Sequence, residues 1–173
     1  MNPSLVGSEM CIRDSQYRDD AGQFCAQKIR AIEPDENGKR KTMWTGEKKR
    51  AVGFGMHLAN PAKHQKLVIT EGEIDAPSVY QAFDGKVAAI SVPDGAQSSP
   101  GFVRKHLDKF LEFKIIVIAT DNDGPGDEAA NKIMELFEPG RVRRAILPKK
   151  DSNEVLQELG SLALKDAIEA AKE

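Results

Sequence analysis

The chain has 173 residues, of which 40% are hydrophobic and 30% are charged, an ordinary composition for a globular protein with one core or one core plus a small satellite. Its net charge of −2 gives no indication of a nucleic-acid partner. No apolar run approaches the ~20 residues that a membrane span needs, and the N-terminus lacks the layout of a signal peptide.

The charge is unevenly distributed along the chain. Residues 28–50 contain eight basic and four acidic side chains, a local charge of +4 that leaves −6 for the rest. This pattern indicates a basic N-terminal segment joined to an acidic body. Cys11 and Cys25 have neither metal-ligand spacing nor a disulfide pattern, so a reducing, cytoplasmic setting is the simplest interpretation.

The first 59 residues divide into two parts. Residues 1–15 show no periodicity and are expected to be a disordered terminus or a non-native leader, such as a translated library remnant, outside the fold. In residues 16–59, turn-forming clusters at 17–23 and 34–38 alternate with strand patterns at 24–30 and 41–46. We predict a small antiparallel, basic β subdomain, whose lysines and arginines either bind a partner or keep an exposed sheet soluble.

Residues 60–160 alternate between strand and helix patterns. Strands are predicted at 66–70, 87–92, 114–120 and 142–147, and helices at 74–83, within 102–111, at 129–137 and at 153–159. This order predicts an α/β domain, a Rossmann-like parallel sheet with helices on both faces and right-handed crossovers. Residues 161–173 are predicted to form a final charged helix that frays.

Carboxylates follow two of the predicted strands. Glu71 and Gly72 come directly after one apolar run, and Asp121, Asp123 and Gly124 after another. Because ligands of parallel sheets bind beyond the carboxyl ends of the strands, we expect these carboxylates to share an opening. Carboxylates gathered there repel one another unless a cation neutralises them, and oxygen ligands suit Mg²⁺ or Mn²⁺. The sequence therefore predicts a metal site.

Other acidic residues near these strand ends have two interpretations each. Asp75 lies four residues beyond Glu71 and can face the same opening, whereas Glu73 fits an acidic first helical turn. The Asp-Asn-Asp-Gly run from Asp121 is also a common turn. Asp151 either caps the following helix or adds a metal ligand, while Lys149 and Lys150 attract phosphates.

Other catalytic patterns are missing from the sequence. The three histidines are far from the acidic clusters, and neither a nucleophile elbow nor a phosphate-binding or dinucleotide-binding glycine loop occurs.

The acidic strand ends resemble those of the Toprim domain, which bacterial-type primases, type IA and II topoisomerases and certain nucleases share. The ordered motifs are similar to the primase part of bacteriophage primase-helicases: residues 70–75 (TEGEID), 93–96 (PDGA), 121–126 (DNDGPG), 141–143 (RVR) and 147–154 (LPKKDSNE). Residues 17–19 (YRD), 27–30 (QKIR), 45–46 (TG) and 54–55 (FG) resemble the small basic subdomain that precedes Toprim there. The resemblance covers about residues 17–159.

The resemblance implies a DNA primase that makes short RNA primers on single-stranded DNA from ribonucleoside triphosphates with Mg²⁺ or Mn²⁺. Three residues would be catalytic and hold the metal, and two would assist as ligands: Glu71, Asp121 and Asp123, with Asp151 and Asp75. Four basic residues would contact nucleotide or DNA: Lys28, Arg30, Lys49 and Lys150. Primases of this kind usually also carry a zinc-binding module and a helicase, which we expect on the same parent protein or in trans. The expected location is the cytoplasm, that of the host cell if the protein is phage-encoded.

Alternative functions stay open. A Toprim nuclease would use the same metals for hydrolysis, and a nucleic-acid-binding module would have lost activity. A topoisomerase needs a tyrosine nucleophile, and neither Tyr17 nor Tyr80 is in a fitting context. A phosphorelay receiver domain also places acids at strand ends, but the Glu-Gly strand end and the basic segment do not suit it.

Overall fold

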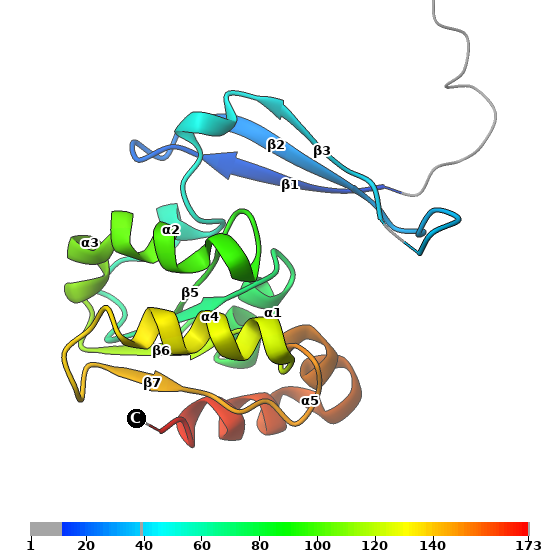
Figure 1. The fold of residues 1–173 in the computed structure, drawn as a ribbon. Coiled ribbons are helices and arrows are strands. Elements are labelled where there is room, and N and C mark those ends of the chain that lie inside the picture. The colour runs from blue at the N-terminus through cyan, green and yellow to red at the C-terminus, as the bar shows by residue number, and fades with distance from the viewer. Residues whose placement is uncertain (1–11, 39, 173) are drawn as a thin grey trace, which may run out of the picture. The chain divides into compact units, whose positions relative to one another are not determined.

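The computed structural model describes residues 12–38 and 40–172 (Figure 1). The chain forms two compact units, residues 1–51 and 52–173. The boundary lies eight residues before the end of the predicted basic subdomain, because the segment from Val52 onward belongs with the second unit. Phe54, for example, forms a backbone bridge with Ser91 of that unit's sheet.

The first unit is a three-stranded antiparallel sheet with β2 in the middle. Its strands are β1 (Ile12–Arg18), β2 (Phe24–Ala31) and β3 (Thr42–Gly46), followed by the 3₁₀ helix η1 (Lys48–Arg50). The predicted antiparallel β subdomain is confirmed, but β1 begins inside the segment that we had excluded from the fold. Residues 13–16 of this strand are all polar, so no hydrophobic alternation marks it, and it is held by backbone pairing from Ile12–Ala31 to Arg18–Phe24. Residues 1–11 lie outside the described part of the chain.

The second unit contains a four-stranded sheet in the order β5-β4-β6-β7, in which every pairing is parallel. The strands are β4 (Lys66–Thr70), β5 (Ala88–Ser91), β6 (Ile115–Ala119) and β7 (Val142–Arg144). The predicted Rossmann-like sheet is confirmed. Strand β7 is shorter than predicted, although the Ala145 N–H still donates to the Ile118 carbonyl.

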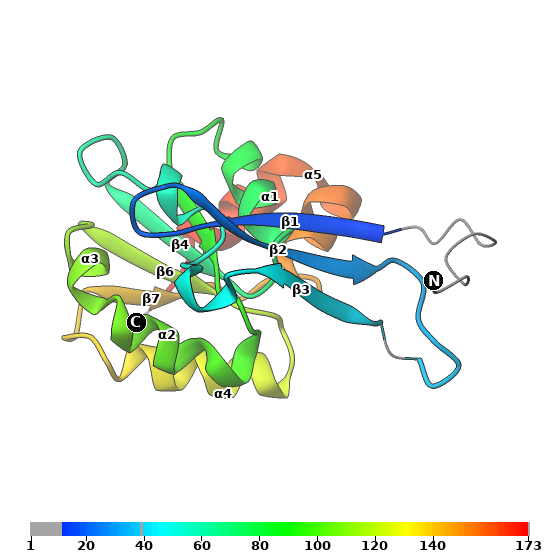
Figure 2. The same ribbon diagram turned by 90° about the horizontal axis from the view of Figure 1, so that it is seen from above.

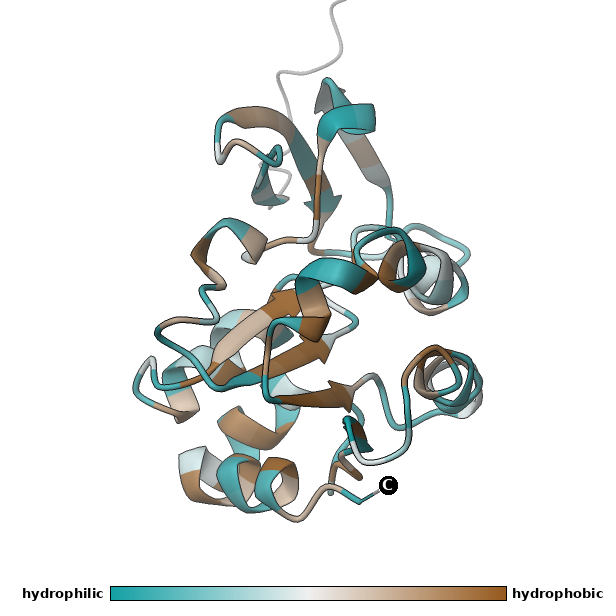
Figure 3. Ribbon diagram, turned by 90° about the vertical axis from the view of Figure 1, so that its left-hand side faces the viewer, coloured by the Kyte–Doolittle hydropathy of each residue, from teal (hydrophilic) through white to brown (hydrophobic). Residues whose placement is uncertain are grey.

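Helices cover both faces of this sheet, as Figures 2 and 3 show. Helices α2 (Ser99–Lys105), α3 (Leu107–Leu111) and α4 (Gly124–Met134) bury apolar side chains on one face, and α1 (Asp75–Ala82) and α5 (Ser152–Glu169) on the other. The strands between them are the apolar centre of the unit in Figure 3. Two 3₁₀ helices, η2 (Met56–Leu58) and η3 (Ala96–Ser98), complete the unit.

The C-terminal part of α5 is packed rather than frayed. The backbone of Gly160 is non-helical, with φ 86° and ψ 173°, and divides α5 into the two helical segments that the sequence predicted. Leu164 and Ile168, beyond this break, are buried in the same apolar cluster as Val79 of α1. The predicted fraying is therefore wrong, because these side chains anchor the segment to the sheet. No helix among residues 12–38 and 40–172 is long and apolar enough to cross a membrane.

Candidate active site

The two acidic strand ends lie side by side. Strands β4 and β6 are neighbours in the sheet and run in register, with Thr70 opposite Ala119. Glu71 lies one residue beyond Thr70, and Asp121 lies two residues beyond Ala119. Both therefore emerge at the same edge of the sheet. This adjacency is what the sequence predicted from the parallel-strand pattern.

Glu71 has one buried oxygen without a hydrogen-bond partner. Its Oε1 accepts a hydrogen bond of 3.2 Å from the Ala96 backbone N–H, whereas Oε2 is buried and unpartnered. Burial raises the pKa of Glu71, and the nearby negative charge of Asp123 raises it further. A buried carboxylate oxygen without a donor is costly, so this position favours a proton or a cation.

Asp121 has a still more perturbed carboxyl group. Burial, followed by the charges of Glu71, Asp75 and Asp151, raises the pKa of Asp121 to about 7. Lys150 opposes this effect, with its Nζ 3.9 Å from Asp121 Oδ2. The repulsion shows that carboxylates from three separate loops act on one another at this edge of the sheet.

Asp123 and Asp151 each cap a helix. Asp123 Oδ1 accepts from the Gly126 N–H at 2.9 Å at the start of α4, and Asp151 Oδ1 accepts from the Glu154 N–H at 2.7 Å at the start of α5. The capping interpretation that the sequence left open for Asp151 is thus observed, and Asp123, for which a turn was the alternative, caps α4 in the same way. Each cap occupies one carboxylate oxygen and leaves Oδ2 for another role.

Asp75 joins two loops. Its Oδ2 accepts from the Gly72 N–H at 3.1 Å, and its Oδ1 accepts from the Asn153 N–H at 2.9 Å. Burial and the charges of Asp151 and Glu71 raise the pKa of Asp75 to about 6. Because both of its oxygens have backbone donors, Asp75 fits a positioning role better than that of a free ligand.

A second set of contacts fixes the loop between β6 and α4. The Thr120 hydroxyl donates to the Gly126 carbonyl at 2.8 Å, and Arg144 of β7 donates to both groups at 2.7 and 3.0 Å. Arg144 also pairs with Asp127 at 2.6 Å. The Arg144 side chain is only 12% exposed, and its guanidinium holds the first turn of α4, and with it Asp123, against the sheet.

The carboxylates meet some of the requirements of a divalent-metal site. In the described residues, no three His, Cys, Asp or Glu side chains converge as a metal cluster as they stand. Three observations nevertheless fit a cation: the unpartnered Glu71 Oε2, the raised pKa of Asp121, and the uncommitted second oxygens of the two capping aspartates. Hard oxygen donors of this kind suit Mg²⁺ or Mn²⁺.

The basic residues predicted to contact nucleotide or DNA lie in different places. Lys28 and Arg30 are on β2, and Lys49 is exposed on η1 of the same unit. Lys150 belongs to the second unit and is 62% exposed beside Asp121. Sequence reasoning missed Trp44, on β3 opposite Lys28, and its neighbour Lys48. The position of Trp44 within a predicted strand, three residues after Lys41 and four before Lys48, was the available signal.

Comparison with known proteins gives the family. The pattern of the family described as Toprim-like matches residues 68–156, which include Glu71, Asp121, Asp123 and Asp151. The chain belongs to the Toprim-like family. It is 35% identical over 140 residues to the DNA helicase/primase of Enterobacteria phage T3, a match that covers 81% of the chain and 23% of the relative. It is 31% identical over 184 residues to the Twinkle homolog protein of Arabidopsis thaliana, covering 94% and 24%. This Toprim-like chain thus spans about a quarter of the length of these relatives.

Solved structures extend the similarity to both units. The chain resembles the crystal structure of the primase fragment of bacteriophage T7 primase-helicase, with a TM-score of 0.76, 31% identity, and coverage of 91% of this chain and 62% of the other. A chain in the structure of T7 lagging-strand DNA polymerase with primase domains bound to an RNA/DNA hybrid and dTTP gives a TM-score of 0.77 at 30% identity, covering 93% and 78%. The RNA polymerase domain of Mycobacterium tuberculosis primase, at 23% identity and a TM-score of 0.65, shares the fold.

Proposed function

We propose that this chain is the catalytic core of a DNA primase, a nucleotidyltransferase that makes short RNA primers on single-stranded DNA from ribonucleoside triphosphates. The observation that carries the proposal is the edge of the parallel sheet, where Glu71 has a buried, unpartnered oxygen and Asp121 has a pKa raised by its acidic neighbours. The similarity to phage helicase/primases supports the same reaction.

Glu71, Asp121 and Asp123 would hold Mg²⁺ or Mn²⁺, with Asp151 assisting through its second oxygen. When bound, the cation would stabilise the charge that develops on the attacking and leaving oxygens during nucleotidyl transfer. Glu71, whose pKa is raised, is suited to accept the proton of the attacking 3′-hydroxyl. Asp75 would position the loops that carry these groups.

The basic residues would hold the polyanionic substrates. Lys150 beside Asp121 would contact a triphosphate at the site, and Lys28, Arg30 and Lys49 would contact nucleotide or template phosphates through sequence-independent attraction. A helicase and a zinc-binding module, on the same parent protein or in trans, are the proposed partners; similarity to a phage helicase/primase and to a phage primase-helicase supports the helicase. The cytoplasmic location stays a prediction, because the relatives include both a phage protein and a chloroplastic/mitochondrial one.

Primer synthesis by the purified chain tests the proposal. Single-stranded template, labelled ribonucleotides and Mg²⁺ should give short RNA products that disappear in Glu71→Gln and Asp121→Asn. The exposed Asp108→Asn on α3 is the control and should make normal amounts of product. Template degradation without ribonucleotide incorporation would support the nuclease instead, and salt-sensitive DNA binding without any product would support the binding module.

A further inference from the structure

One tryptophan and two lysines form a cluster on the sheet of the first unit. The Lys48 ammonium lies 4.9 Å from the centroid of the Trp44 ring, and the Lys28 ammonium lies 5.6 Å from it. On the same ring, Tyr17 packs at a centroid distance of 4.7 Å with a tilt of 51°. Tyr17 is fully buried, whereas Trp44 is partly exposed, so Tyr17 supports a ring that solvent can reach.

The strand register places this cluster on a basic face. Between β2 and β3, Trp44 pairs with Lys28 and Thr42 pairs with Arg30. Between β1 and β2, Arg13 pairs with Arg30. Because directly paired residues of an antiparallel sheet point to the same face, these side chains share one face. The Nε of Arg30 is buried without a hydrogen-bond partner.

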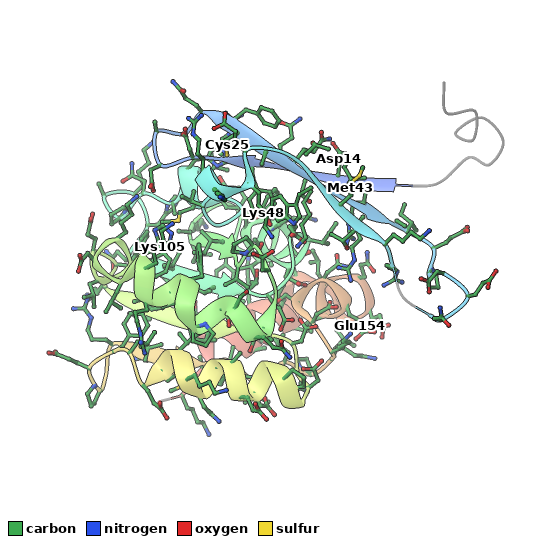
Figure 4. The ribbon with its side chains drawn as sticks, turned by 45° about the horizontal axis from the view of Figure 1, so that its top comes forward. Asp14, Cys25, Met43, Lys48, Lys105 and Glu154 are labelled. Carbon is green, nitrogen blue, oxygen red and sulfur yellow. The ribbon has the colours of Figure 1, made fainter. Side chains whose placement is uncertain are left out.

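The opposite face of the sheet has a different character. It carries Asp14, Gln27, Ile29 and Met43 by the same register, and Gln27 donates to Asp14. Figure 4 labels Asp14 and Met43 on this stretch of the sheet, and Lys48 near the other end of β3. The positive charge of the three strands is therefore concentrated on the face of Trp44.

Two ammonium groups drawn to one aromatic ring have a specific chemical consequence. Each is attracted to the ring, but together they raise the positive potential around it. An anion near the ring is attracted by both ammonium groups, and a flat group on the exposed part of the ring gains stacking contact. A nucleotide offers both, since its base is flat and its phosphate is the adjacent anion.

We propose that Trp44, Lys28 and Lys48 form a binding site for one nucleotide of single-stranded nucleic acid, with its base stacked on Trp44 and its phosphate held by the two ammonium groups. The inference rests on the proposed primase function and adds detail to it: besides Lys28, Trp44 would contact the template by stacking and Lys48 would contact a template phosphate. A free nucleoside triphosphate has the same chemistry, and the experiment below distinguishes the two sources.

Trp44 is the only tryptophan of the chain, so the intrinsic tryptophan fluorescence of the intact protein reports this site alone. Oligodeoxythymidylate should quench the fluorescence in a saturable manner. An abasic oligomer of equal length, which has phosphates but no bases, should bind more weakly and leave the fluorescence nearly unchanged. A ribonucleoside triphosphate should quench only at much higher concentration; full quenching by the triphosphate and none by the oligomer would overturn the assignment to a strand.

Variants test the two contacts separately, with labelled oligodeoxythymidylate and fluorescence anisotropy as the readout. Trp44→Ala should weaken binding by about tenfold or more, and Trp44→Phe should restore part of the affinity, since the loss is that of one base stack. Lys48→Ala should reduce the slope of log affinity against log salt by about 0.7, because one phosphate contact is lost.

Two control variants separate these effects from misfolding and from general charge. Met43→Ala changes an exposed side chain on the opposite face of β3, and Lys105→Ala removes an exposed positive charge from α2. Both should bind with unchanged affinity. If Trp44→Ala and Trp44→Phe fold normally and bind as tightly as the unaltered chain, the inference is wrong.

The inference and the proposed function can fail independently. Primers made by the unaltered chain, together with unchanged DNA affinity in Trp44→Ala, would refute the stacking site alone. Trp44-dependent binding by a chain that makes no primers would refute the primase reaction and leave the site in place.

Discussion

The carboxylate of Asp75 accepts a hydrogen bond from the Asn153 backbone N–H at 2.9 Å, 78 residues away along the chain. This bond connects the start of α1 to the start of α5, and the Ser78 hydroxyl strengthens the connection by donating to Asn153 Oδ1 at 3.2 Å. Asp151 lies in the loop that this connection secures. The arrangement of the carboxylates at this edge of the sheet therefore depends on Asp75, although both Asp75 oxygens accept hydrogen bonds from backbone N–H groups.

Asp75→Ala should lower both stability and primer synthesis. It leaves the N–H groups of Gly72 and Asn153 without acceptors, at a cost of roughly 1–3 kcal/mol for each buried group, offset in part by removal of a buried charge. Urea unfolding followed by far-UV circular dichroism measures the change. Asn153→Ala is the matched control, because it keeps the backbone donor and loses only the side-chain bond to Ser78. Equal destabilisation in the two variants would contradict the assignment.

Stability should fall as pH rises through the neutral range. The pKa of Asp121 is raised from 3.8 to about 7 and that of Asp75 to about 6, so the folded chain binds more protons than the unfolded chain between about pH 4 and pH 7. The stabilisation that these protons supply is complete below pH 4 and is lost as pH passes 6 to 7. Urea midpoints at pH 5, 6, 7 and 8 should show this decline, with a smaller slope in Asp121→Asn. A slope that Asp121→Asn leaves unchanged would count against the raised pKa of this residue.

Mg²⁺ should stabilise the second unit at pH 7.5 and do so less at pH 5.5. A cation bound only by the folded state raises stability by about 2.7 kcal/mol when its concentration is 100 times its Kd, and protons on Asp121 compete with it. The melting temperature in MgCl₂ should therefore exceed that in NaCl of equal ionic strength. Glu71→Gln should remove most of the difference, and a shift that persists in this variant would place the cation elsewhere.

Two nearby glycines should respond differently to alanine. A Cβ at Gly126 would lie 2.1 Å from the Asp121 carbonyl oxygen, whereas a Cβ at Gly124, two residues earlier, meets nothing within 4 Å. Gly126→Ala should displace the Asp121 backbone, abolish primer synthesis and destabilise the unit. Gly124→Ala should leave stability unchanged or raise it by about 0.4–1 kcal/mol, because alanine restricts the unfolded chain. Thermal melts of the two variants make the comparison, and similar melting temperatures would contradict it.

Much of the second unit could be predicted from the sequence because its strands are unbroken apolar runs. Ile116 and Ile118 are buried on one face and Val117 on the other, which is the signature of a parallel sheet between helices. The placement of Glu71 beside Asp121 followed from that sheet. The roles of Asp75 and Arg144 could not be predicted, because they depend on backbone groups brought close only by folding.

The first unit was harder to predict because its strands do not bury a continuous apolar face. Arg13, Asp14 and Ser15 have no alternating hydrophobicity, and strand β1 is specified by its pairing with β2. The cluster around Trp44 likewise arises from cross-strand register. Only the composition of residues 28–50 indicated in advance that the unit was basic.

The early start of β1 has a consequence for any shortened form of the protein. Residues 12–15 pair with residues 28–31, so a chain beginning at Gln16 would leave that half of β2 as a bare edge. Unpaired N–H and C=O groups along an edge can recruit a strand from a second molecule. A version trimmed to begin at Gln16 would therefore be prone to self-association through β2, the strand that carries Lys28 and Arg30.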